Sequence, residues 1–262
     1  MKLAREAGAD VAHFSEACLS GYAGAEFSSF KGYDWDLYEK CAKEVMAAAG
    51  KFKIWAIVGG NHRLNGKHKP HNSLYIINSR GQLVNRYDKL FCTGNEKGGD
   101  LKYYSPGSDF VTFKIKGFTC GVLICYDFRF QELYREYYKK GVQVMFHSFY
   151  HSSQDKDCLK KFNLLGVIVP PTLQTYAANN HMWISSTNTS TQVSRWPSFF
   201  VNPNGTISGR LINNKAGVLV STVDTKIEYY DASRLWRDRV IKGIYHSGTL
   251  VKDPRSKNKK SL

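Results

Sequence analysis

The stretch Gly121-Val-Leu-Ile-Cys125-Tyr-Asp-Phe-Arg-Phe-Gln-Glu-Leu133 carries the strongest structural signal in this chain of 262 residues. An apolar run over residues 118–124 predicts a buried strand, and apolar side chains at helical spacing follow it. Cys125 thus lies on a strand-to-helix turn beside free helix amides, which favour a thiolate and can receive an oxyanion. The turn resembles a nucleophile elbow with sulfur in place of oxygen. The alternative, an inert buried thiol, is the commoner state of a lone cysteine.

Two other segments change that balance. Residues 9–22 read as a short apolar strand that leads to Glu16 and then to a turn-prone loop. Residues 72–91 read as a hairpin with its turn at Ser79-Arg80-Gly81, and Lys89 follows its second strand directly. Taken singly, Glu16 and Lys89 are more often solvated surface charges. A glutamate, a lysine and a cysteine, each following its own strand, together predict one shared site.

Together these segments resemble the carbon–nitrogen hydrolase family, the nitrilase and aliphatic amidase superfamily. The family's Glu-Lys-Cys triad falls on Glu16, Lys89 and Cys125, and the motif Cys-Tyr-Asp-x-Arg-Phe-x-Glu-Leu is similar to omega-amidase-like members. The resemblance covers most of the chain; it also includes residues 4–10, Ile57-Val-Gly-Gly-Asn, Tyr104-Ser-Pro-Gly, residues 171–188 and residues 198–205.

The resemblance implies an α/β fold, the α-β-β-α four-layer sandwich. The family usually begins with a strand ahead of its first helix, whereas Met1-Lys-Leu-Ala-Arg5 opens inside that helix. We therefore expect a sandwich without its first strand and with an exposed sheet edge, which is an association hazard. Residues 1–250 are expected to form a single domain, and residues 251–262 a basic, disordered tail.

The expected reaction is hydrolysis of a small carboxamide through a cysteine thioester, which releases ammonia and a carboxylic acid. By resemblance, Glu16 moves the protons, Cys125 attacks the carbonyl, and Lys89 with the backbone N–H of Tyr126 stabilises the oxyanion. Glu96 is a candidate second glutamate that positions substrate and lysine, or else a loop carboxylate.

Further candidates for substrate positioning follow the nucleophile. Arg129 suits either an ion pair or a clamp for a substrate carboxylate, and Asp127 suits support of the cysteine loop. After the strand predicted at 142–146, the family commonly has an Asn-Pro loop, but this chain has residues 147–154 instead. We expect that loop, with His147 and Tyr150, to set specificity.

The composition is that of a globular enzyme, with 42% hydrophobic residues. No apolar run is long enough for a membrane span, and residues 1–10 lack the apolar core of a signal peptide. Six cysteines (18, 41, 92, 120, 125 and 158) without CxxC spacing are expected to be reduced thiols of a cytoplasmic protein. We expect no cofactor and no metal, and interpret His62, His68 and His71 as part of a polar hairpin loop.

The formal net charge is +15. Such a charge can indicate nucleic-acid binding, but no zinc knuckle, RNP-like run or helix-turn-helix pattern accompanies it. A basic surface that favours anionic substrates is the preferred interpretation. By resemblance we expect a homodimer or a higher homo-oligomer; the interface candidates are Tyr134, Tyr137, Tyr138 and the tail from Arg234.

Periodicity extends the prediction to the remaining elements. Helices are expected at 171–180, where Pro171 would start the helix, at 226–239, and around a face formed by Leu37, Cys41, Val45, Ala48 and Phe52. Strands are expected near 54–59, 73–77, 83–87, 110–115, 118–124, 142–146, 182–186, 198–201, 206–211 and 217–223.

Other functions remain open from the sequence. Within C–N chemistry, N-carbamoyl amide hydrolysis and nitrile hydrolysis are the nearest alternatives. A catalytically inactive, basic binding protein on the same fold is a non-enzyme alternative. A papain-like Cys-His protease that uses His147 or His181 would leave Glu16 and Lys89 without a role.

Overall fold

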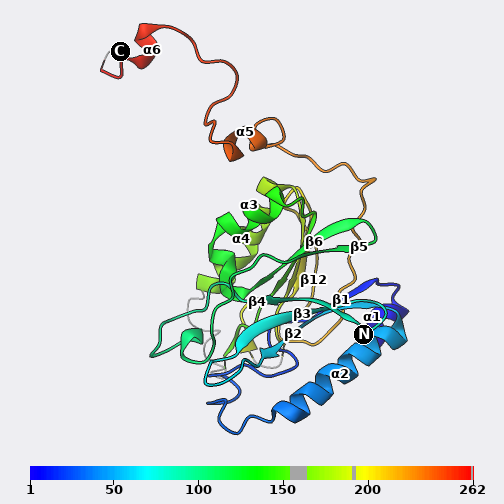
Figure 1. The fold of residues 1–262 in the computed structure, drawn as a ribbon. Helices are drawn as coiled ribbons and strands as arrows, with labels where there is room; N and C mark the ends of the chain where they lie inside the picture. The colour runs from blue at the N-terminus through cyan, green and yellow to red at the C-terminus, as the bar shows by residue number, and fades with distance from the viewer. Residues whose placement is uncertain (154–163, 191–192, 261) are drawn as a thin grey trace.

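The computed structural model describes residues 1–153, 164–190, 193–260 and 262. Within these ranges, two sheets pack face to face and helices cover the outer side of each, with α2 below and α3 and α4 on the opposite side (Figure 1). The four-layer α-β-β-α sandwich expected from the sequence is confirmed.

The first sheet has the order β1-β2-β3-β4. Its strands are β1 (Val11–His13), β2 (Trp55–His62), β3 (His71–Ile77) and β4 (Leu83–Asp88). β1 is parallel to β2, and β3 is antiparallel to both β2 and β4, so β4 runs in the same direction as β1. The carboxyl ends of β1 and β4 therefore lie at the same end of the sheet, and the segments of Glu16 and Lys89, which follow these strands, come together there.

The outer face of this sheet is covered by α2 (Trp35–Phe52) and the short α1 (Lys2–Glu6). The Asp34 carboxylate caps α2 by accepting a hydrogen bond from the Leu37 backbone N–H, which is otherwise without an intrahelical partner. Apolar side chains of α2 pack on the sheet through Val45, Met46 and Ala49. Leu37, which the sequence placed on that face, lies in the first turn and is 55% exposed.

The second sheet has the order β12-β11-β9-β7-β6-β5. Its strands are β5 (Thr112–Ile115), β6 (Phe118–Ile124), β7 (Val144–Ser148), β9 (Trp183–Thr187), β11 (Phe199–Val201) and β12 (Ile207–Arg210). β6, β7 and β9 are mutually parallel, so the residues that follow them gather at one edge. Beside that edge, β8 (Ser152–Ser153) pairs with β10 (Val193–Ser194).

Two helices cover the outer face of the second sheet: α3 (Gln131–Lys139) and α4 (Leu164–Asn180). Tyr134 and Tyr137 of α3 are fully buried in the main apolar cluster, and a Cβ on Gly121 would meet the Tyr137 ring at 2.8 Å. Both are therefore core residues, so their prediction as interface residues is wrong. The helical spacing of Tyr134 and Tyr137 correctly placed them on one face of the helix, but that face packs on the sheet.

Three predicted elements differ from the structure. Pro170 and Pro171 lie inside α4, because Val169 and Leu173 pack on the core and extend the helix toward its N-terminal side. Residues 217–223 form no strand; they run as an extended segment with Leu219 and Val223 against the core. In the region 226–239, only the start of α5 (Arg237–Ile241) is helical.

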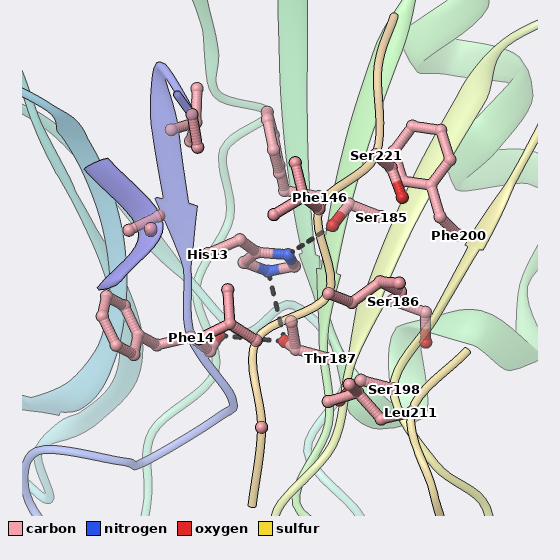
Figure 2. Close-up of a pocket in the computed structure, with 18 of the residues that line it drawn as sticks. His13, Phe14, Phe146, Ser185, Ser186, Thr187, Ser198, Phe200, Leu211 and Ser221 are labelled. Atoms are coloured by element: carbon pink, nitrogen blue, oxygen red, sulfur yellow. Dashed lines mark hydrogen bonds between the residues drawn. The ribbon is translucent and has the colours of Figure 1, made fainter. Parts of the chain in front are cut away.

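A pocket of about 900 Å³ opens between β1, the inner face of the second sheet and residues 217–223. β1 is hydrogen-bonded to β2 alone among the described strands, and its residues line this pocket. His13 points from β1 toward the second sheet, where Nδ1 lies 2.9 Å from Ser185 Oγ and Nε2 lies 3.4 Å from Thr187 Oγ1 (Figure 2). Nε2 also lies 2.9 Å from Ser148 Oγ. None of Glu16, Lys89 and Cys125 lines this pocket.

The C-terminal segment leaves the sandwich as an arm that carries α5 and α6 (Pro254–Lys257) (Figure 1). Its described residues from Ser247 onward are exposed. The single domain over 1–250 and the disorder of 251–262 stay predictions. In the described part of the chain, no helix combines the length and the apolarity that crossing a bilayer requires.

Candidate active site

Cys125 begins a 3₁₀ turn, η2 (Cys125–Arg129), directly after β6. Its φ is +41°, a left-handed conformation that costs free energy in a residue other than glycine. The buried carboxylate of Asp127 holds the turn: it accepts from the backbone N–H of Ile124 (3.0 Å), the N–H of Phe91 (3.0 Å) and the Tyr87 hydroxyl (2.8 Å). Burial raises the pKa of Asp127 to about 6. Asp127 therefore joins the cysteine turn to the segment after Lys89.

A charged cluster without solvent exposure lies at the same edge. The Lys89 ammonium is 2.9 Å from Glu16 Oε1 and 2.7 Å from Asp100 Oδ2. Glu16 and Lys89 are both 0% exposed and Asp100 is 2% exposed. Buried charges persist only when they are paired and hydrogen-bonded, because each loses its hydration. Two carboxylates around one ammonium meet that requirement.

Both oxygens of Glu16 have further donors. The Asn72 side-chain amide donates to Oε1 at 2.7 Å, and the Tyr150 backbone N–H donates to Oε2 at 2.7 Å. These contacts come from β3 and from the loop after β7, so the two sheets jointly fix the carboxylate.

The electrostatics separate the roles of the two carboxyls. Burial raises the pKa of Glu16, and Lys89 and the hydrogen bonds lower it only in part. Burial alone would raise the pKa of Asp100, but Lys89 and the Tyr22 hydroxyl outweigh it and hold that pKa below its ordinary value. Burial disfavours the Lys89 ammonium, yet Glu16 and other neighbours raise its pKa well above the ordinary value. Asp100 and Lys89 therefore stay charged, and Glu16 is the member suited to exchange a proton.

The Cys125 thiol belongs to the same electrostatic cluster. Burial and then Glu16 raise its pKa well above the ordinary value, while Lys89 and a hydrogen bond from the Tyr150 backbone lower it in part. The sequence predicted that helix amides would favour a thiolate, but burial and the carboxylates outweigh them. A raised pKa favours the thiol over the thiolate, so a base beside the sulfur assists its attack.

An aromatic pair lies beside the cluster. Tyr22 and Tyr150 stack with ring centroids 4.7 Å apart, and the Tyr22 hydroxyl donates to Asp100 Oδ1 at 2.5 Å. The Tyr150 hydroxyl lies 2.9 Å from an oxygen of Glu26. Tyr150, expected to position substrate, thus contributes its backbone to Glu16 and its ring to this pair.

The structure separates two predicted residues from the cluster. Glu96 is exposed and pairs with Lys69 at 2.5 Å, whereas the buried ammonium of Lys89 contacts Asp100. Arg129 is exposed and lies over the Phe128 ring at 4.8 Å. Glu96 and Asp100 lie in the same glycine-rich loop after Lys89. Spacing along the sequence does not show which of the two acids turns toward the lysine.

His147 is brought to Cys125, but not to its sulfur. The fully buried ring lies with Nε2 3.1 Å from the Cys125 carbonyl oxygen and Nδ1 2.5 Å from the Tyr134 hydroxyl. Burial lowers the pKa of His147 to about 3. His181 instead faces Asp231 at 3.5 Å. The Cys-His protease alternative is therefore wrong. Gln154, the end of the predicted specificity loop, and Cys158 lie outside the described residues.

Three residues of the site were missed from sequence: Asn72, Asp100 and Tyr22. Asn72 is the second residue of β3 and is fully buried, and a buried amide needs a hydrogen-bond partner. In the described ranges, no group of three or more His, Cys, Asp or Glu side chains is arranged to hold a metal ion.

Comparison with known proteins bears on the family. The model of the carbon–nitrogen hydrolases matches residues 1–230. The 2-oxoglutaramate amidase of Bacillus subtilis (strain 168) is 30% identical over 140 residues, which cover 53% of this chain and 51% of that protein. A human omega-amidase is 27% identical over 143 residues, 53% of this chain and 50% of its own. The alignments thus span about half the length of these curated relatives.

Solved structures bear on the fold. An amidase of Nesterenkonia sp. AN1 superposes with a TM-score of 0.73 at 19% identity, over 92% of this chain and 88% of its own. A mutant of that amidase, which carries acrylamide added at its active-site cysteine, gives 0.72 at 18% identity over the same shares. At such identities the likeness shows the fold alone.

Proposed function

The chain belongs to the carbon–nitrogen hydrolase family, and from this membership we propose that it hydrolyses the C–N bond of a small carboxamide through a cysteine thioester. The observation that carries the proposal is the buried cluster of Glu16, Lys89 and Asp100 beside the thiol of Cys125. A structural ion pair alone would not require a strained cysteine in the same electrostatic environment.

In the first half of the proposed reaction, the thiol proton passes to Glu16 as the sulfur of Cys125 attacks the substrate carbonyl. The carbonyl π electrons move to oxygen, where the ammonium of Lys89 and the N–H of Tyr126 stabilise the negative charge. Glu16 then protonates the amide nitrogen, the C–N bond breaks, and ammonia leaves a thioester on Cys125. The raised pKa values of Glu16 and the thiol suit a transfer coupled to attack.

In the second half, water attacks the thioester carbonyl while Glu16 accepts a proton from it. The C–S bond breaks, the carboxylic acid leaves, and the proton returns to the sulfur. Asp100 holds Lys89 in place through both halves, because its own low pKa keeps it charged.

The test is intact-mass spectrometry after incubation with a panel of short amides, together with assay of ammonia. The expected result is a transient acyl adduct and release of ammonia; both are lost in Cys125→Ala. Cys41→Ala on the outer helix α2 is the matched control and keeps both. Turnover that survives Cys125→Ala would refute the mechanism, and carbon dioxide released with the ammonia would redirect it to N-carbamoyl amides.

A further inference from the structure

A buried chain of two hydrogen bonds ends on the nucleophile's own peptide. His147 Nε2 lies 3.1 Å from the carbonyl oxygen of Cys125, which can only accept, so Nε2 carries the proton and donates. Nδ1 is then the accepting nitrogen, and the Tyr134 hydroxyl donates to it at 2.5 Å. The low pKa of His147, caused by burial, keeps this neutral tautomer throughout the ordinary pH range.

The ring has little freedom to leave this arrangement. His147 stacks on Phe149 with centroids 4.3 Å apart and on Tyr134 at 6.0 Å, and all three side chains are fully buried. The donors come from β7 and α3, two elements that pack on β6 and its turn but carry none of the triad. Packing thus holds the imidazole and its donated proton in one orientation.

The carbonyl of Cys125 and the N–H of Tyr126 belong to one peptide group, which is planar and trans. A donor fixed on the carbonyl therefore fixes the direction of the N–H on the other side of the same plane. It also polarises the amide, because hydrogen bonds in series strengthen one another. The φ of +41° at Cys125 is not one the residue prefers by itself, so the His147 donor adds to the support that Asp127 gives the turn.

We propose that His147, oriented by Tyr134, is a positioning residue that sets the direction and strength of the Tyr126 N–H as the oxyanion donor. The inference rests on the proposed function, because it assigns His147 to the oxyanion that forms during acylation. It also changes the interpretation made from sequence, in which His147 belonged to a loop that positions the substrate and sets specificity.

The test compares two reactions of the same sulfur. Acylation by an amide develops an oxyanion, whereas alkylation by iodoacetamide is a displacement at carbon and develops none. His147→Phe keeps a ring that can stack on Phe149 but removes the donor. It should lower kcat for amide hydrolysis about 10- to 100-fold, somewhat less than deletion of an oxyanion donor, with KM within about twofold and the alkylation rate unchanged.

Two further variants separate positioning from folding. Tyr134→Phe should lower kcat about 3- to 10-fold in the same pattern, because the imidazole then loses its orienting donor. Tyr137→Phe is the matched control, since it removes another buried α3 hydroxyl, which donates to the Val122 carbonyl at 2.8 Å. It should cost similar stability in urea unfolding and leave kcat within twofold. His147→Gln, which can still donate from an amide, should recover part of kcat.

The outcomes divide cleanly when wild-type protein is run in parallel. Acylation that falls while alkylation holds supports the inference. Equal losses in both reactions, or a His147→Phe variant as active as wild type, overturn it. Failure of the proposed function looks different, because the wild-type protein itself would then release no ammonia from any amide.

Discussion

The ammonium of Lys89 lies 2.7 Å from a carboxylate oxygen of Asp100, and both groups are buried. Eleven positions separate them, and the glycine-rich loop between them also carries an exposed acid, Glu96. The acid that turns inward is the one that opens the 3₁₀ turn η1 (Asp100–Lys102), where the Thr93 backbone N–H also donates to its Oδ2 at 3.0 Å.

This relationship predicts unequal effects of two conservative changes in one loop. Asp100→Asn removes the negative charge that pairs with the Lys89 ammonium. It should lower kcat about 100-fold, as expected when an electrostatic group of the site is lost. Glu96→Gln is the control and should change kcat less than twofold, because an exposed ion pair contributes about 0–1 kcal/mol. Steady-state kinetics on the best amide checks both; equal effects would contradict the assignment of Asp100.

The hydrogen bond from Asn72 predicts a shift in the pH dependence. This donor lowers the pKa of Glu16, so Asn72→Ala should raise that pKa further. The ionised base would then appear at higher pH, and the acidic limb of kcat/KM should move upward. Asn85→Ala, at an exposed position of β4, should leave the limb unchanged. A limb that stays in place in Asn72→Ala would show that Glu16 is not the titrating base.

Close packing around Gly59 predicts that its replacement displaces the base. A Cβ there would lie 2.4 Å from the Ala17 nitrogen and 2.5 Å from the Ser15 oxygen, both backbone atoms that flank Glu16. Gly59→Ala should therefore cost about 1–3 kcal/mol of unfolding free energy and abolish most activity. Gly98→Ala is the control: its Cβ meets nothing within 4 Å and should change stability by less than about 0.5 kcal/mol. Urea unfolding and amide kinetics distinguish the two; a Gly59→Ala protein with normal kcat would refute the displacement.

The buried neutral state of His147 predicts acid destabilisation. Its folded pKa of about 3 lies below the ordinary value of 6.5, so between these values the unfolded chain binds the extra proton. The stabilisation is complete above pH 6.5 and is lost as the pH falls toward 3, with a slope of about 1.4 kcal/mol per pH unit. His147→Gln should reduce the slope of unfolding free energy against pH by about that amount. The exposed His68→Gln should not, and equal slopes in all three proteins would contradict the prediction.

Strand and helix positions were largely predictable because an element with one buried face has apolar residues at regular intervals in its sequence. The strand before Cys125 was predicted with its exact bounds, and the hairpin turn was marked by Gly81, whose φ of +77° favours glycine. The strand predicted at residues 217–223 was wrong. Their β-branched and apolar residues match a strand, but a strand also needs a hydrogen-bonding neighbour, and this segment has none among the described strands.

The site was predictable in part for a similar reason. Residues that directly follow strands can be assigned to a sheet edge from their position in the chain, which located the segments of Glu16, Lys89 and Cys125. Asn72, Asp100 and His147 reach the site through side-chain direction, and neither periodicity nor spacing encodes that direction. The direction of the Cys125 pKa shift also escaped prediction, because burial and nearby carboxylates outweigh the local amides.

The sequence by itself determined most strands and helices along the chain, because these depend on local hydrophobic pattern and turn residues, which short stretches of chain contain. Its resemblance to the carbon–nitrogen hydrolases implied the layers of the sandwich and assigned chemical roles to the segments of Glu16, Lys89 and Cys125. Only the tertiary structure decided which acid contacts Lys89, that the pKa of Cys125 is raised rather than lowered, and that His147 contacts the carbonyl of Cys125. Those outcomes depend on distances between groups far apart in the chain and on how much water their packing excludes, and both exist only once the two sheets have met.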